Sequence, residues 1–431
     1  MFGSHRRSDV LRAVVGGVFA ATLGGCESAD AHLSGPKGGS AFIHYVAIGT
    51  SISMGVQSAG VLYNSQVEAW PSLLARAAGA GFSVPLLRSP GCTPPLIAPL
   101  QLARFLSGTG TLTTDTSCAG ALGVLTPPLN NVALAGATAW AALNLTPKLV
   151  AAAPGRYDAG DRGRYPLVLA LTQSQVTAMA VQGASFVSVE LGFAELLRAA
   201  TSGLVVAATA YTQADPFTYV PAAQFAPVYA AIADSVKRSG ARAVLLSVPH
   251  VTRLPAMRVG SELWNARADL ATFGVTVADD CNGSTNLVFT GTLIPTLAQS
   301  ALAGSAQVLS CADLPGAADG VLTPADIITL DAVIEQMNAQ IRQLATQNGW
   351  AFADLDAAFA NFVAARTPYR ASEQLACVYP YGAFISLDGV HPNVSGHQAI
   401  ARQVAEAVNA TYGFAIQVAA PVPLPSAALC P

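Results

Sequence analysis

The sequence predicts an α/β fold in which a parallel sheet lies between two layers of helices. Three observations lead to this prediction. Short apolar runs recur along the chain, segments with helical spacing separate them, and 52% of the 431 residues are hydrophobic, which is ample for a packed core. Strands that alternate with helices favour a parallel sheet covered on both faces, a three-layer α/β/α sandwich.

Four apolar runs are predicted to be the strands of this sheet. They are short and contain few charges, as strands buried on both faces do. In chain order they are residues 43–48, 185–191, 242–248 and 351–355.

Three helices are predicted with clear boundaries. Residues 222–238 form one. The clearest begins after the capping residue Thr323, with Pro324 at its first position and Asp326 in its first turn, and it stops at Asn348-Gly349. The apolar face of the last helix and the glycine that ends it are Ile400, Val404, Val408 and Gly413.

Two stretches interrupt the alternation, residues 89–128 and 279–320, and both are poor in periodic structure. We expect them to be loops or small caps near the site. No internal repeat and no clean linker is visible, so the sequence favours one elaborated domain over residues 41–415, followed by a tail at 416–431.

The first 26 residues have the pattern of a processing signal. Arg6, Arg7 and Arg12 precede an apolar run at 13–23 that is too short to span a bilayer. The run ends in Leu-Gly-Gly-Cys, which resembles the lipobox of bacterial lipoproteins and implies lipidation at Cys26. We therefore expect an exported protein, periplasmic or at the cell surface, that meets the membrane only through this anchor, with a linker at 27–40. An ordinary secretory signal cut nearby is the alternative.

Six further cysteines remain after Cys26. An even number in an exported chain is typical of disulfides, but six cysteines allow 15 pairings, so the connectivity stays open. Pairing nearest neighbours would give Cys92–Cys118, Cys281–Cys311 and Cys377–Cys430.

The charge pattern excludes some functions. Only 11% of the residues are charged and the net charge is −3, which argues against nucleic acid as a partner. No close Cys/His spacing suggests a metal site, and nothing in the chain calls for a cofactor.

Two segments at opposite ends of the predicted domain contain residues of the types that act in nucleophilic catalysis. Asp388 and His391 are three residues apart, and Pro392 stiffens the turn. An aspartate at this spacing can fix the imidazole tautomer and support the charge that a general base gains. Ser51 follows the first predicted strand, and open parallel sheets place ligands at the carboxyl ends of their strands. The sequence thus predicts a serine hydrolase with the triad Ser51, His391 and Asp388.

Four short segments, spread over nearly all of residues 41–413, resemble the ordered blocks of the SGNH hydrolases, also called GDSL-type esterases and lipases. This resemblance implies a flavodoxin-like three-layer fold and acyl transfer to Ser51. The family usually has an acid or Asn before the serine, whereas this chain has Thr50. The four segments are GTSIS at 49–53, NNVALAGAT at 130–138, GFAE at 192–195 and DGVH at 388–391.

The resemblance also implies an oxyanion hole made by the backbone N–H groups of Ser51 and Gly136. The third donor of the family is an Asn side chain, and that position is Ala194, whose methyl group cannot donate. Glu195 beside it accepts hydrogen bonds when ionised, so we expect it to oppose an oxyanion. Side chains from neighbouring loops that could replace the donor are Gln57, Asn130 and Asn131.

Three other histidines have simpler interpretations. His250 is expected in a loop at the edge of the site, His397 at the surface or behind the triad, and His44 in a strand.

The favoured function is that of a serine esterase acting on small or medium acyl esters, including lipid esters, with turnover slowed by Ala194. Two alternatives stay open. One is a degenerate family member that binds an ester, lipid or glycan without efficient turnover. The other is a carbohydrate O-deacetylase or acyltransferase on the same scaffold.

Overall fold

The centre of the molecule is a four-stranded parallel sheet with the order β1-β5-β8-β14. Its strands are β1 (Tyr45–Gly49), β5 (Phe186–Glu190), β8 (Arg242–Leu246) and β14 (Ala351–Ala353). The computed structural model describes residues 38–98, 100, 103–105, 112–113, 117–124, 126–212, 217–376 and 380–422. The sheet confirms the predicted fold class.

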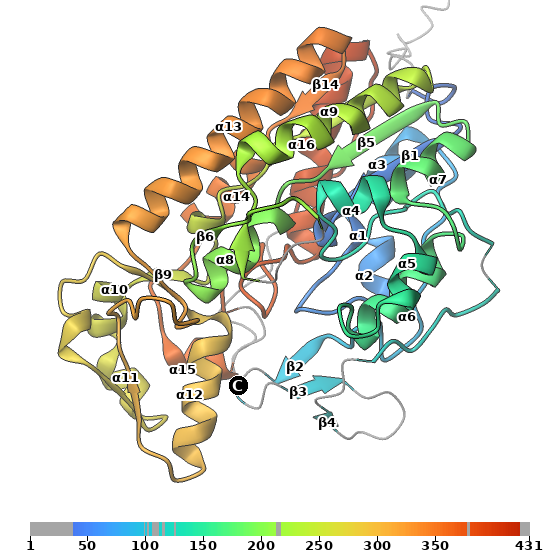
Figure 1. Cartoon of the computed structure of the whole chain (residues 1–431). Coiled ribbons are helices and arrows are strands. Elements are labelled where there is room, and N and C mark those ends of the chain that lie inside the picture. Colours follow the sequence, from blue (N-terminus) through green and yellow to red (C-terminus); the bar gives the residue numbers. More distant parts are fainter. Residues whose placement is uncertain are drawn as a thin grey trace, which may run out of the picture. The chain divides into compact units, whose positions relative to one another are not determined.

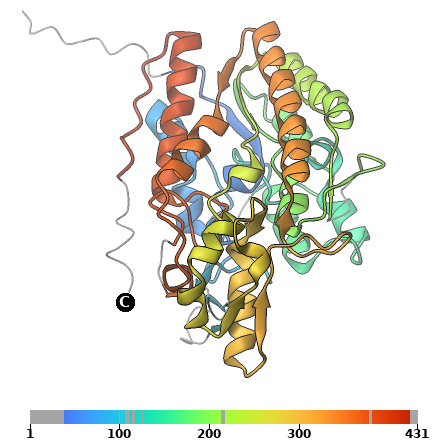
Figure 2. The same ribbon diagram turned by 90° about the vertical axis from the view of Figure 1, so that its left-hand side faces the viewer.

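Helices cover both faces of this sheet (Figure 1). One face carries α4 (Ala139–Asn144), α7 (Gln175–Val181), α9 (Ala222–Arg238) and α13 (Pro324–Asn348). The other carries α3 (Trp70–Ala78), α14 (Leu355–Ala364) and α16 (Val394–Tyr412). Figure 2 shows the red α16 and the orange α13 on opposite sides of the sheet, so the three predicted layers are present.

The long helix α13 forms for the reasons that the sequence gives. The Thr323 hydroxyl accepts from the Asp326 N–H, and the Asp326 carboxylate accepts in return from the Thr323 N–H, a reciprocal cap. Gly349 ends the helix with a φ of 65°. The apolar residues Leu330, Ile334, Met337 and Ile341 recur at helical spacing and are buried. The bounds predicted for α9 are also confirmed.

Each strand is one or two residues shorter than predicted. β1 begins at Tyr45 because residues 41–44 form turns. β14 ends at Ala353 because the Asp354 side chain caps the next helix by accepting from the Ala357 N–H. The helices between the second block and β5 were not predicted, since they are brief and Ala-rich. Besides α4 and α7 these are α5 (Pro147–Ala152) and α6 (Ala159–Val168).

The stretch 279–320, expected to be loops or a small cap, belongs to a folded insertion at 257–322. The insertion surrounds an apolar cluster of its own that includes Leu263, Ile294 and Leu309. Three strands, β9 (Met257–Val259), β11 (Leu287–Phe289) and β13 (Val321–Leu322), form an antiparallel sheet. A parallel pair, β10 (Val275–Val277) and β12 (Gln307–Leu309), and the helices α10 (Gly260–Asn265), α11 (Arg267–Ala271) and α12 (Thr290–Leu302) complete it.

The remaining elements are short. They are α1 (Ser51–Met54), α2 (Tyr63–Val67), α8 (Ala194–Ser202), α15 (Ala371–Ala376), β2 (Leu96–Ala98), β3 (Ala103–Phe105), β4 (Leu112–Thr113), β6 (Val206–Ala207), β7 (Thr218–Tyr219), and the 3₁₀ turns η1 (Val251–Arg253) and η2 (Asp279–Cys281).

Two disulfides are present among the described residues, Cys92–Cys118 and Cys281–Cys311. They are two of the three nearest-neighbour pairs, and they indicate an oxidising compartment outside the cytoplasm. Cys26, Cys377 and Cys430 lie outside the described residues. In the described part of the chain, none of the helices has the length and apolar character needed to cross a membrane.

Candidate active site

The turn that follows β1 is fixed from two neighbouring elements. Glu190 at the end of β5 accepts hydrogen bonds from the N–H and hydroxyl of Thr50 and from the N–H and hydroxyl of Ser53, at 2.8–3.2 Å. Gln175 from α7 bonds both the N–H and the carbonyl of Gly49. A Cβ on Gly49 would lie 2.4 Å from the Ser53 hydroxyl oxygen, so only glycine fits. Ser51 is therefore held between anchored neighbours.

Glu190 also explains the departure at Thr50. Where the resembled family has an acid or Asn before the serine, this chain has a hydroxyl that donates to an acid on the adjacent strand. Burial raises the pKa of Glu190 despite its four donors. Sequence reasoning missed this residue, although an acid that ends the apolar run SFVSVEL was a visible signal.

Ser51, His391 and Asp388 come together in one hydrogen-bonded chain. The Ser51 hydroxyl oxygen lies 2.9 Å from His391 Nε2, and His391 Nδ1 lies 2.7 Å from Asp388 Oδ2. Ser51 is 7% exposed, and the His391 side chain is 12% exposed. This is the order of contacts that a nucleophile, a general base and an orienting acid require.

The carboxylate of Asp388 is kept ionised by its surroundings. Burial alone would raise its pKa, but the facing His391 imidazole and the N–H groups of Val390 and His391 lower it to about 2. The turn that carries Asp388 needs a residue with a left-handed backbone conformation. Gly389 has a φ of 71°, and a Cβ there would lie 2.4 Å from the Ala256 Cβ.

Two backbone N–H groups are available near the serine. The segment after Asn131 runs beside β1, where Leu134 donates to the Gly49 carbonyl, and this brings the Gly136 turn next to the Ser51 turn. Gly136 is exposed and has a φ of 75°. Neither the Ser51 nor the Gly136 N–H has a partner among the described residues. Free N–H groups are what an oxyanion hole needs.

Glu195, which we expected to oppose an oxyanion, has hydrogen-bond partners of its own. Its carboxylate faces the start of α4, where it accepts from the Ala139 N–H and the Tyr211 hydroxyl, both at 2.6 Å. The Tyr211 oxygen accepts in turn from the Trp140 N–H. Burial raises the pKa of Glu195 to about 7. Glu195 thus fixes the helix that follows Gly136, and Ala194 begins α8 beside it.

Two of the three amide side chains proposed as replacement donors are already engaged. The Asn130 amide donates to the Tyr45 carbonyl, and the Asn131 amide donates to the Ser53 carbonyl. The Gln57 Nε2 is buried without a partner among the described residues. Of the three, Gln57 is the one whose amide nitrogen has no partner at all among the described residues.

The other histidines are outside the hydrogen-bonded chain of Ser51, His391 and Asp388, although His397 lies within electrostatic reach of His391. His250 lies in the loop before η1, as expected, but it is 5% exposed and its Nδ1 lies 2.8 Å from Asp356 Oδ1. His397 is fully buried in α16, and burial lowers its pKa to about 3, which excludes the surface position. His44 is exposed and lies just before β1, not within it.

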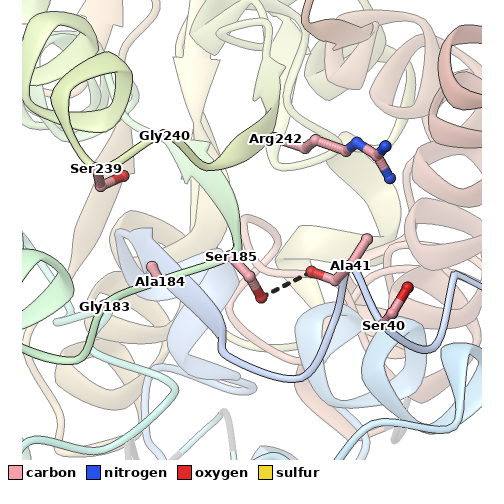
Figure 3. Close-up of a pocket in the computed structure, with 8 residues that line it drawn as sticks. All are labelled: Ser40, Ala41, Gly183, Ala184, Ser185, Ser239, Gly240 and Arg242. Atoms are coloured by element: carbon pink, nitrogen blue, oxygen red, sulfur yellow. Dashed lines mark hydrogen bonds between the residues drawn. The ribbon is translucent and has the colours of Figure 1, made fainter.

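Two other features of the described residues lie away from Ser51, His391 and Asp388. Within the described ranges, the one cluster with metal-ligand spacing is Asp280 with Cys281 and Cys311, and its sulfurs form a disulfide. A cavity of about 460 Å³ opens at the amino ends of β1, β5 and β8, opposite the strand ends that carry Ser51 and Glu190 (Figure 3).

No family model and no curated protein matches the chain. Solved structures with a coarse likeness include one described as a GDSL-like lipase from Parabacteroides merdae, at 11% identity and a TM-score of 0.34 over 85% of this chain and 96% of that one. The acetylxylan esterase Axe2 from Geobacillus stearothermophilus has 13% identity and a TM-score of 0.32 over 87% and 96%. An α/β hydrolase, LAE5, from the metagenome of Lake Arreo has 13% identity and a TM-score of 0.34 over 85% and 95%.

Proposed function

We propose that this chain is a serine esterase of the SGNH type that hydrolyses small or medium acyl esters. The observation that supports it most is the unbroken chain of contacts Ser51 Oγ–His391 Nε2 and His391 Nδ1–Asp388 Oδ2, at 2.9 and 2.7 Å. Two free N–H groups, on Ser51 and Gly136, lie on neighbouring turns where an oxyanion would form.

In the first half of the reaction, Ser51 Oγ attacks the ester carbonyl while His391 Nε2 takes its proton. Asp388 orients the imidazole and stabilises its positive charge. The carbonyl oxygen becomes negative and accepts from the Ser51 and Gly136 N–H groups. The imidazolium then protonates the leaving alcohol, and an acyl-serine remains.

In the second half, His391 takes a proton from water, which attacks the acyl-serine. Collapse of the second tetrahedral intermediate returns the proton to Ser51 and releases the carboxylic acid. Every step uses side chains and backbone groups of this chain, together with water.

A fluorophosphonate probe tests the proposal directly. We expect stoichiometric labelling of Ser51 in the wild type and none in Ser51→Ala. Ser51→Ala and His391→Ala should each abolish hydrolysis of p-nitrophenyl acetate, while Asp388→Asn should leave more residual rate. Hydrolysis by Ser51→Ala at the wild-type rate would refute the esterase.

A ligand-binding protein without efficient turnover is the second candidate, because Ala194 lacks the donor that the family carries there. The same probe separates the two. A binder would leave Ser51 unlabelled while an ester or glycan still raised its melting temperature.

A further inference from the structure

The segment Gln57–Gly60 forms a tight hairpin turn with an unfavourable backbone. Gln57 donates to the Gly60 carbonyl at 2.8 Å, and Gly60 donates back to Gln57 at 3.1 Å. The central residues both have positive φ, 53° for Ser58 and 52° for Ala59. Turns with two such residues strongly prefer Asn and Gly, because a Cβ disfavours the left-handed region. Serine and alanine are held there only if surrounding contacts enforce the conformation.

The N–H groups of both residues contact the segment that carries Asp388, while the Ser58 carbonyl accepts from the Leu96 N–H at 2.8 Å. The Ser58 N–H donates to Ser386 Oγ at 2.8 Å, and the Leu387 N–H donates to Ser58 Oγ at 3.3 Å. The Ala59 N–H donates to Asp388 Oδ2 at 2.5 Å. Both strained residues therefore present their N–H groups to this one segment.

The oxygen that Ala59 contacts is the one that orients the base. Asp388 Oδ2 is also 2.7 Å from His391 Nδ1, so the Ala59 N–H and the imidazole share it. A carboxylate that accepts from two sides has less freedom to rotate about its side-chain bonds, which fixes the direction in which the imidazole is held.

Ser386 links the turn to the rest of the triad. It is 2% exposed, and its hydroxyl accepts from the Ser58 N–H. The same hydroxyl can donate to the His391 carbonyl, at 2.9 Å, or to Asp388 Oδ1, at 3.2 Å. Its single proton serves one acceptor at a time, so Ser386 donates either to the His391 carbonyl or to Asp388 Oδ1.

The other end of the same segment is bonded to the nucleophile. The Val56 N–H, one residue before the turn, donates to the Ser51 carbonyl at 2.9 Å. A short stretch of chain thus connects the backbone of Ser51 to the carboxylate of Asp388 without passing through His391.

We propose that the Gln57–Gly60 turn and Ser386 are positioning residues that set the Asp388 carboxylate relative to Ser51 and His391. The role rests on the proposed esterase function, because it acts only through that triad. Loss of the contact should lower turnover and leave substrate binding nearly unchanged, since the misplaced group acts on proton transfer and not on the bound ester.

The first experiment compares Ser386→Ala with Ser247→Ala. Ser247 is a matched control, because it is 3% exposed, accepts from the Asp356 N–H and donates to the Asp354 carboxylate, away from the triad. We expect Ser386→Ala to lose roughly tenfold or more in kcat for p-nitrophenyl acetate with KM within about twofold. Ser247→Ala should lose comparable thermal stability and keep its kcat.

The second experiment changes only the backbone preference at Ala59. Ala59→Gly keeps the N–H and tolerates the positive φ, so it should retain wild-type kcat. Ala59→Val keeps the N–H but disfavours that φ, so it should displace the donor from Asp388 and lower kcat. Comparing the two variants separates the effect of the backbone geometry of the turn from the effect of changing the Ala59 side chain.

Ser51→Ala, assayed alongside, separates the two proposals. If hydrolysis depends on Ser51 while Ser386→Ala and Ala59→Val keep wild-type kcat, the positioning role is refuted and the esterase stands. If Ser51→Ala hydrolyses the ester as fast as the wild type, both proposals fail.

Discussion

At the scale of single residues, three buried carboxylates around the candidate site differ in their proton affinity. The pKa of Asp388 is lowered to about 2, because an imidazole and several N–H groups outweigh its burial. Burial dominates at Glu195, raising its pKa to about 7, and it also raises the pKa of Glu190. The His391 imidazole faces Asp388, whereas both glutamates accept from N–H and hydroxyl groups.

Glu195 should make stability depend on pH. Its pKa rises from 4.5 to about 7 on folding, so its contribution is fully present below pH 4.5 and declines until about pH 7. At about 1.4 kcal/mol per unit, the loss is on the order of 3 kcal/mol. We expect Glu195→Gln to flatten this decline in thermal melts recorded from pH 4 to 8. The exposed Glu406→Gln is the control, and a wild-type slope in Glu195→Gln would contradict the prediction.

Ala194 should limit the rate if no other side chain fills the oxyanion hole. Ala194→Asn would then raise kcat roughly tenfold or more, since the new donor bonds an oxygen that is charged only in the transition state. Ala194→Asp has the same size without a donor and should not accelerate the reaction. Steady-state kinetics on p-nitrophenyl acetate measure both.

The competing view is that the Gln57 amide, which is buried without a partner among the described residues, fills the oxyanion hole. In that case wild-type turnover would be brisk, Ala194→Asn would bring no gain, and Gln57→Leu would lower kcat. This pattern would contradict the missing-donor account and leave the triad assignment intact.

The triad could be predicted from sequence because Asp388 and His391 lie in one local motif and Ser51 directly follows a recognisable strand. The roles of Glu190, Ser386 and Ala59 could not be predicted from the sequence in this way. Their roles depend on contacts between segments far apart in the chain, and neither a serine nor an alanine has a sequence signal for such a contact.

At the scale of elements, the two disulfides support different parts of the molecule. Cys92 lies beside the segment that follows the Gln57–Gly60 turn, since its N–H donates to the Val61 carbonyl at 2.7 Å. Cys281 and Cys311 belong to the apolar cluster of the insertion at 257–322. Their chemistry is the same, but only the first bond lies next to the proposed positioning turn.

The double variants Cys92→Ala/Cys118→Ala and Cys281→Ala/Cys311→Ala should therefore differ in activity. Each removes a cross-link over a similar span, 26 and 30 residues, and should cost roughly 3 kcal/mol of unfolding free energy. Only the first should also lower kcat at a temperature where both variants are folded. Equal kcat values for the two double variants, measured under conditions where both are folded, would argue against a link between the Cys92 segment and the turn.

Sequence periodicity predicted the long elements and failed for the short ones. The 25 residues of α13 carry a cap, an apolar face and a terminating glycine, which agree with one another. The strands of the insertion are two or three residues long, too short for alternation to appear, and they are stabilised by the cluster that they enclose. These strands form because of that packing, which cannot be predicted from a local sequence pattern.

At the scale of the whole molecule, lipidation at Cys26 remains a proposal. It rests on the Leu23-Gly24-Gly25-Cys26 pattern and agrees with the oxidising compartment that the disulfides indicate. We expect intact-mass analysis of membrane-extracted protein to give a chain that begins at Cys26 with added acyl mass. A product that begins beyond Cys26 without acyl mass would contradict it.

The contact between Ser51 and His391 joins residues 340 positions apart. A chain still being synthesised carries Ser51 long before it carries His391. Under the proposed mechanism, ester hydrolysis therefore appears only after both segments have been made and have come together. In refolding experiments, ester hydrolysis should return after the helical circular dichroism signal has recovered, because the base must find its nucleophile across nearly the full length of the domain.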